Sequence, residues 1–263
     1  MSASEAEQVS AEFLDKLKAA SQRVLLLDYD GTLAPFVVDR NQAFPYPEVP
    51  ELVSRITAQG TRVVLISGRA AREIILLSGI HPHPEIWGSH GLERLKPDGS
   101  YEVEPLPADD ENALLEAADA MRREDLERQL ELKPGGVAVH WRGMDPAEIT
   151  ALRDRIKTLW AGVMESDHLK LLDFDGGIEL RTMAASKARA VNAILSESHP
   201  EAAVAYLGDD LTDEDAFHAL KGKGLSVLVR EQPRPTIADL WLRPPDDLIR
   251  FLQEWSRATG GEA

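Results

Sequence analysis

The chain has 263 residues, a formal net charge of −16 and no cysteine. The lack of cysteine excludes disulfide bonds, thiolate chemistry and zinc thiolate sites. The negative charge argues against nucleic acid and against an anionic membrane surface as partners. An anionic substrate would need a local cation at its site, and the length suffices for one large domain or two small ones.

The amino-terminal stretch MSASEAEQVSAEFLDKL predicts a polar, amphipathic helix and lacks the apolar core of a signal peptide. No apolar run in the sequence approaches the length of a membrane span. We therefore expect a cytoplasmic protein.

Short apolar runs alternate with helix-spaced stretches near both ends of the chain. In the first part the predicted elements are a strand at 24–28, a helix at 48–59, a strand at 62–67 and a helix at 68–79. From Lys187 onward they are a helix, a strand at 204–208, a helix after Asp213 and a strand at 225–229. This alternation predicts an α/β protein with a mainly parallel sheet.

The middle of the chain follows a different pattern. The stretch LERLKPDGSYEVEP predicts a hairpin that turns at Asp98-Gly99, and a charged helical stretch follows it. A strand, a helix and a second hairpin, which turns at Asp175-Gly176-Gly177, come next. We therefore expect an inserted α+β domain between two parts of one core domain, with the core at 1–95 and 179–263 and the insertion at 96–178.

Two aspartates, Asp28 and Asp30, directly follow the first apolar strand. Burying a close pair of carboxylates is costly unless a cation, a shared proton or solvent compensates for it. Three further polar groups stand where a predicted strand ends or a helix begins, which is where open α/β sheets bind ligands. They are Ser67-Gly68-Arg69, Lys187, and Gly208-Asp209-Asp210 with Thr212-Asp213. Carboxylates, a hydroxyl and an ammonium group together suit phosphoryl transfer with Mg²⁺, so a bound cation is the expected compensation.

The same segments carry a resemblance to a known superfamily. DYDGT (28–32), ISGR (66–69), Lys187 and GDDLTDEDAF (208–217) resemble the four ordered motifs of the haloacid dehalogenase superfamily. Within it the chain resembles the trehalose-6-phosphate phosphatase family, through LDYDGTLAPF, GSHGLE, ELKPGGVAVHWR, IELR and GDDLTDEDAF. The resemblance implies a Rossmann-like core with a mainly parallel sheet and an inserted α+β cap domain.

The resemblance also implies roles for individual residues. Asp28 would be the nucleophile, and Asp30 would protonate the leaving sugar oxygen and then activate water. Mg²⁺ would bind the side chains of Asp28 and Asp209 and the backbone carbonyl of Asp30. The remaining implied positions are Ser67 and Lys187 on the phosphoryl oxygens, Asp210 and Asp213 around the metal, and Gly68, Arg69, His90, Glu131, Lys133, Arg142 and Glu179 in substrate binding.

The function that these motifs imply is Mg²⁺-dependent hydrolysis of trehalose 6-phosphate to trehalose and phosphate, through an aspartyl-phosphate. Arg181-Thr182 and Lys187-Ala188 depart from the usual Arg-Pro and Lys-Gly of the family, so a related osmolyte precursor, glucosylglycerol phosphate or mannosylglycerate phosphate, stays open as substrate. A non-catalytic regulatory domain that binds a sugar phosphate is a further alternative. The implied partner is a small sugar phosphate, and association with a trehalose-6-phosphate synthase stays open.

Some of these residues also have purely structural interpretations. A second D-x-D-G begins at Asp173, but it lacks the following threonine and fits a hairpin turn, so Asp28 keeps the nucleophile assignment. Ser67 is a good helix cap in its own right. Glu131, Lys133 and Glu179 fit a solvated strand face as well as a sugar site, and His140 is expected to be structural.

Overall fold

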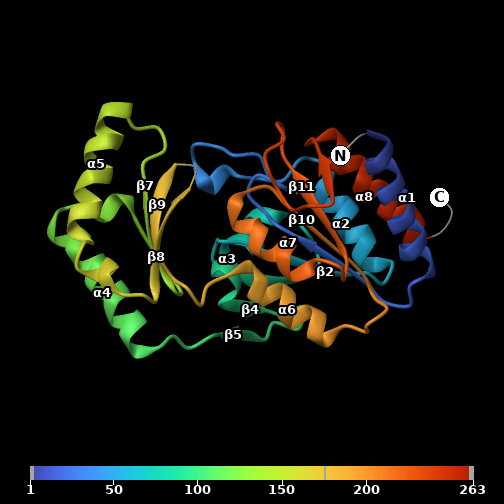
Figure 1. Cartoon of the computed structure of the whole chain (residues 1–263), viewed down its shortest axis with the longest axis horizontal. Helices are drawn as coiled ribbons and strands as arrows, with labels where there is room; N and C mark the ends of the chain where they lie inside the picture. The colour runs from blue at the N-terminus through green and yellow to red at the C-terminus, as the bar shows by residue number, and fades with distance from the viewer. Residues whose placement is uncertain (1–2, 175, 261–263) are drawn as a thin grey trace. The chain divides into compact units, whose positions relative to one another are not determined.

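The structure is a computed structural model, and it describes residues 3–174 and 176–260 (Figure 1). The chain divides into two compact units, Met1–Glu102 with Ser186–Ala263, and Val103–Ala185. Within the described ranges, no helix combines the length and the apolar character that crossing a membrane requires.

The first unit contains an eight-stranded sheet with the order β12-β11-β10-β1-β2-β3-β4-β5. From β12 to β3 all neighbours are parallel, and β4 is antiparallel to β3. The expected α/β fold with a mainly parallel sheet is therefore confirmed. The strands are β1 (Arg23–Leu27), β2 (Arg62–Ile66), β3 (Glu85–Gly88), β4 (Glu93–Leu95), β5 (Tyr101–Val103), β10 (Ala203–Gly208), β11 (Leu225–Val229) and β12 (Leu240–Leu242).

Helices cover both faces of this sheet, which explains why the central strands β1 and β2 are apolar at every position after their first residue. Leu25 and Leu27 of β1 belong to one apolar core, and Val24 and Leu26 belong to a second core on the opposite face. The helices are α1 (Ala3–Ala19), α2 (Val49–Ala58), α3 (Ala71–Ser78) and α8 (Asp246–Gly260), which contribute to the first core, and α6 (Lys187–Glu197) and α7 (Glu214–Leu220), which contribute to the second.

The second unit is an antiparallel sheet with the order β6-β7-β9-β8, covered on one face by helices. Val139, Ile178 and Leu180 point into its core, where the buried Trp160 donates a hydrogen bond from Nε1 to the Ala117 carbonyl at 3.0 Å. Its elements are α4 (Ala108–Arg123), β6 (Leu130–Lys133), β7 (Gly136–His140), α5 (Pro146–Leu159), β8 (Leu169–Phe174) and β9 (Gly177–Thr182).

The boundaries of the second unit lie at 103 and 185, whereas the sequence pattern placed an insertion at 96–178. The first hairpin turns at Gly99 as expected, where φ is +86°, but its strands β4 and β5 belong to the sheet of the first unit. At the other end, β9 pairs with β7 and β8 and so belongs to the second unit. Asp175, in the expected second turn, lies outside the described residues.

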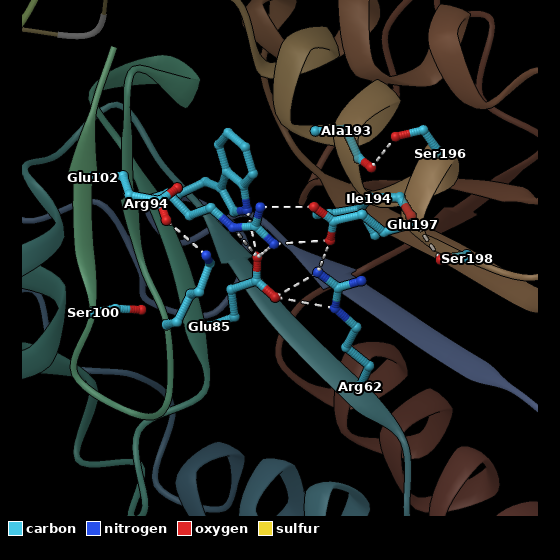
Figure 2. Close-up of polar contacts among 12 residues, drawn as sticks. Arg62, Glu85, Arg94, Ser100, Glu102, Ala193, Ile194, Ser196, Glu197 and Ser198 are labelled. Atoms are coloured by element: carbon cyan, nitrogen blue, oxygen red, sulfur yellow. Dashed lines mark hydrogen bonds and ion pairs between the residues drawn. The ribbon is translucent and has the colours of Figure 1, made fainter.

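A closed ring of ion pairs joins three strands of the first unit to the end of α6 (Figure 2). Glu85 accepts from Arg62 at 2.7 Å and from Arg94 at 2.8 Å, and Glu197 accepts from both of the same arginines at 2.7 Å. The Trp87 indole donates to Glu85 at 2.9 Å, and Arg94 stacks over the Trp87 ring. The ring thus ties the carboxyl end of α6 to β2, β3 and β4.

The free energy of unfolding should depend on pH through Glu197 of this ring. The two arginines lower the pKa of the Glu197 carboxyl from 4.5 to about 2. A depressed folded-state pKa gives stability that is present above pH 4.5 and is lost as the pH falls towards 2. At about pH 3 the unfolded wild type should hold about one more proton at this site than the folded protein does.

We therefore expect Glu197→Gln to flatten the fall in unfolding free energy between pH 5 and pH 3, measured by urea titration. The control Glu51→Gln removes an exposed carboxylate that pairs with Arg55, and it should keep the wild-type slope. An unchanged slope in Glu197→Gln would show that the ring does not contribute to acid sensitivity.

Candidate active site

Three adjacent parallel strands end at the residues that the sequence singled out. Asp28 follows β1, Ser67 follows β2, and Asp209 follows β10. Because β10, β1 and β2 are parallel neighbours, these side chains share one edge of the sheet. Lys187 is the first residue of α6, and its buried ammonium group reaches the same edge.

A buried cluster of charges forms at this edge. Lys187 Nζ donates to Asp28 Oδ1 at 2.6 Å and to Asp213 Oδ1 at 2.7 Å. The Thr32 hydroxyl donates to the other Asp28 oxygen at 3.0 Å. Residues from β1, α6 and the segment after β10 are therefore linked through one ammonium group.

Asp213 serves as the central acceptor of this cluster. Its Oδ1 also accepts from the Tyr206 hydroxyl at 2.5 Å, and its Oδ2 accepts from the backbone N–H groups of Asp209 and Asp210 at 3.0 and 2.9 Å. Each oxygen of Asp213 thus accepts two hydrogen bonds. The two from backbone N–H groups fix the position of the main chain that carries Asp209. Tyr206 is a residue that the sequence reasoning missed, since a tyrosine inside an apolar strand gives no sign of its distant partner.

The cluster contains three carboxyl groups and one ammonium group. Burial raises the pKa of Asp28 to about 7, although Lys187 lowers it and Asp213 raises it further. Burial, followed by the nearby charges of Asp28 and Asp213, raises the pKa of Asp209 well above its ordinary value. One ammonium group does not offset three buried carboxylates, so the site is suited to a further cation.

The donor set fits a divalent cation that prefers oxygen ligands. Asp28, Asp209 and Asp213 each offer a carboxylate oxygen, and these atoms lie within 4.8 Å of one another. Since Asp213 already accepts four hydrogen bonds, Asp28 and Asp209 are the carboxylates with remaining capacity. Gly31 allows the close approach of Asp209, because a Cβ at Gly31 would lie 2.1 Å from Asp209 Oδ2.

Asp30 lies beside this cluster and is held by an arginine. Arg69 donates from Nε and Nη2 to the two oxygens of Asp30 at 2.6 and 2.7 Å. The Ser67 hydroxyl accepts from the Arg69 backbone N–H at 3.1 Å. The imidazole of His90 packs on Gly68, where a Cβ would lie 2.6 Å from Nε2, so the structure brings His90 to the Ser67–Arg69 loop.

The other predicted substrate-binding residues lie in the second unit. The strand register places Glu131 and Glu179 on either side of Ala138, so all three share one face of the sheet. Lys133 Nζ lies 2.9 Å from Glu179 Oε1, and the His140 ring lies 2.6 Å from Glu131 Oε2. Arg142 follows β7, and its side chain packs where a Cβ at Gly176 would be. The predicted residues therefore form one set in each unit.

The comparison with known families identifies the family of the chain. The family model described as trehalose-phosphatase matches residues 26–245 of the chain, which include every one of the four motifs. The chain belongs to the trehalose-phosphatase family.

Individual relatives extend this result. Trehalose-phosphate phosphatase B of Arabidopsis thaliana is 31% identical over 268 residues, covering 92% of this chain and 69% of the relative. The structure of Aspergillus fumigatus trehalose-6-phosphate phosphatase is 26% identical, with a TM-score of 0.65 over 95% of this chain and 97% of that one. A haloacid dehalogenase-like hydrolase from B. subtilis, at 15% identity, shares the fold with a TM-score of 0.62 over 88% of this chain and 99% of that one. The resemblance to the trehalose-6-phosphate phosphatase family is thus confirmed, and the B. subtilis structure shows that the fold is shared.

Gly31 provides a test of the carboxylate arrangement. A Gly31→Ala substitution should cost about 1–2 kcal/mol for the left-handed backbone and should also displace Asp209. We expect it to abolish most of the rise in melting temperature that Mg²⁺ produces, and to weaken Mg²⁺ binding in calorimetry.

The matched control is Gly60→Ala. Gly60 has nearly the same φ, +86° against +85°, but a Cβ there would meet nothing within 4 Å. It should therefore lose similar stability and keep the full response to Mg²⁺. Equal responses in the two variants would count against a cation site beside Gly31.

Proposed function

We propose that the protein is a Mg²⁺-dependent phosphatase that hydrolyses trehalose 6-phosphate to trehalose and phosphate. The observation that carries the proposal is the buried Asp28, held by Lys187 beside Asp209, in a chain of the trehalose-phosphatase family. Such a site combines a carboxylate nucleophile with cationic groups for a phosphoryl substrate.

The chemistry proceeds in two steps that use Asp28 and Asp30. An oxygen of the Asp28 carboxylate attacks phosphorus, the bond from phosphorus to the sugar oxygen breaks, and the carboxyl group of Asp30 gives its proton to that oxygen. Water then attacks phosphorus and gives a proton to Asp30, and the bond from phosphorus to Asp28 breaks. Phosphate leaves, and both aspartates return to their starting forms.

The surrounding residues support this assignment. Asp28, Asp209 and the backbone carbonyl of Asp30 would hold Mg²⁺, while Asp210 and Asp213 would orient that set. When bound, the metal ion would stabilise the ionised Asp28 and the negative charge of the phosphoryl group. Lys187 and the Ser67 hydroxyl would bind phosphoryl oxygens, and the lack of a Cβ at Gly68 lets His90 pack against the same loop.

Sugar recognition is assigned to the second unit. Glu131, Lys133 and Glu179 supply carboxylates and an ammonium group from one sheet face, and such groups bind sugar hydroxyls well. His90 and Arg142 are assigned to the same substrate. Because the flanks of Arg181 and Lys187 depart from the family pattern, phosphate release should be compared between trehalose 6-phosphate, glucosylglycerol phosphate and mannosylglycerate phosphate.

A non-catalytic, sugar-phosphate-binding role is the alternative from another class. A protein that had lost catalysis would have no need for Asp28, Asp30 and Lys187 together, and this chain retains all three. Phosphate release from trehalose 6-phosphate with Mg²⁺, and its loss with a chelator, separates the two roles.

The two D-x-D-G motifs give a direct test of the nucleophile. With an aryl phosphate and rapid acid quench, the wild type should gain one phosphoryl mass, and Asp28→Asn should gain none. Asp173→Asn removes the matching aspartate of the second motif, which pairs with Arg153 on the surface, and it should behave as the wild type does. A phosphorylated Asp28→Asn protein would overturn the assignment.

A Lys133 variant should separate contacts to the sugar from contacts to the phosphoryl group. We expect Lys133→Ala to lower kcat/KM for trehalose 6-phosphate by about 10²-fold and to leave hydrolysis of an aryl phosphate within about threefold, because remote sugar contacts position the reacting group. Lys157→Ala, on the exposed side of α5, is the control and should change neither. Equal losses on both substrates would show that Lys133 supports the fold only.

A further inference from the structure

The shortest hydrogen bonds of the Arg69 side chain are those to Asp30. Two parallel hydrogen bonds of 2.6 and 2.7 Å join its guanidinium to both carboxylate oxygens of Asp30. Such a paired arrangement fixes the orientation of a carboxylate, which a single point contact does not do. The side chain of Asp30 is 26% exposed, whereas that of Arg69 is only 6% exposed.

The rest of the guanidinium is enclosed by protein. Its Nη1 is buried and has no hydrogen-bond partner within the described chain, and the nearest carboxylate, Glu73, lies 3.9 Å away. Glu73 is itself held by Arg40 at 2.8 Å. The Tyr29 ring lies against the guanidinium, 5.9 Å from its carbon. Arg69 is therefore fixed by neighbours on several sides, and its Nε and Nη2 are directed at Asp30.

The backbone of Arg69 strengthens this placement. Its N–H donates to the Ser67 hydroxyl at 3.1 Å, and its carbonyl accepts from the Ser89 N–H at 2.8 Å. The residue is thus anchored at both its main chain and its side chain. Asp30 lies directly before Gly31, whose φ is +85°, and Arg69 supplies the two side-chain hydrogen bonds that hold its carboxylate.

We propose that Arg69 is a positioning residue that holds the Asp30 carboxyl group in place for proton transfer. This inference rests on the proposed function, since it assigns Arg69 a part in the same reaction. It gives Arg69 a different role from the substrate binding expected from the family resemblance.

The rate of the first step depends on proton transfer to the leaving oxygen for a sugar phosphate more than for an aryl phosphate. A sugar oxygen leaves poorly without a proton, whereas an aryl oxide leaves without one. Loss of Asp30 positioning should therefore slow the first step on trehalose 6-phosphate but spare it on an aryl phosphate. The second step needs Asp30 with both substrates. With an aryl phosphate the phosphorylated enzyme should therefore form and then accumulate, because its hydrolysis is slow.

The experiment compares Arg69→Lys, Asp30→Asn and the double variant with the wild type. Lysine keeps the positive charge but cannot make the paired contact. For Arg69→Lys we expect kcat on trehalose 6-phosphate to fall by about 10²-fold with KM changed less than about threefold. Aryl phosphate should give a phosphoenzyme that accumulates on acid quench, and the double variant should be no slower than Asp30→Asn alone.

Controls separate this role from a structural one. Arg40→Lys weakens the neighbouring pair with Glu73 and should keep the wild-type kinetics. Melting temperatures identify variants that fail to fold, and Arg69→Gln serves as the second variant if Arg69→Lys is unstable. An aryl phosphate that gives no accumulated phosphoenzyme with Arg69→Lys, or losses that multiply in the double variant, would overturn the positioning role. A higher KM with unchanged kcat would show that Arg69 binds the phosphoryl group.

The outcomes for the two proposals differ. A wild type that releases phosphate from no sugar phosphate and no aryl phosphate overturns the proposed function, and the role of Arg69 with it. A wild type that is active on aryl phosphate but not on trehalose 6-phosphate overturns the substrate alone, because phosphoenzyme accumulation still tests Arg69. An active wild type with multiplying losses overturns only the role of Arg69.

Discussion

The site depends on an imbalance of buried charge, in which three carboxylates surround one ammonium group. Asp28, Asp209 and Asp213 converge at the ends of β1 and β10, and Lys187 contacts two of them. Burying so much negative charge destabilises a fold unless cations accompany it. The folded structure is therefore suited to a divalent cation at this edge, which is the cation that the proposed function needs beside an anionic substrate.

The architecture around this cluster keeps its members in fixed positions. The central strands are covered on both faces, so the residues that follow them cannot shift without disturbing two apolar cores. The helix α6 carries Lys187 at its first residue and Glu197 at its last, and the ring of ion pairs attaches that last residue to β2, β3 and β4. Both ends of the helix are thus held by charges.

The two units contribute different chemistry. The first contains the carboxylates, the ammonium group and the Arg69–Asp30 pair that suit phosphoryl transfer. The second presents Glu131, Lys133 and Glu179 on one face of a small sheet, which suits hydroxyl-rich ligands. Under the proposed function, the reacting groups thus belong to the first unit and the groups assigned to sugar recognition belong to the second.

The sequence by itself determined the α/β fold and the order of the motifs. Both can be predicted from short sequence patterns, namely apolar runs at strand spacing and the polar residues directly after them. It also contained a signal for α8 that went unused, with Leu248, Phe251, Leu252 and Trp255 at helical spacing. Only the tertiary structure decided that the hairpin at Gly99 joins the first unit, that Tyr206 donates to Asp213, and that Arg69 holds Asp30. Strand membership depends on pairing between distant segments, and Arg69 and Asp30 are 39 residues apart, so no local pattern encodes either contact.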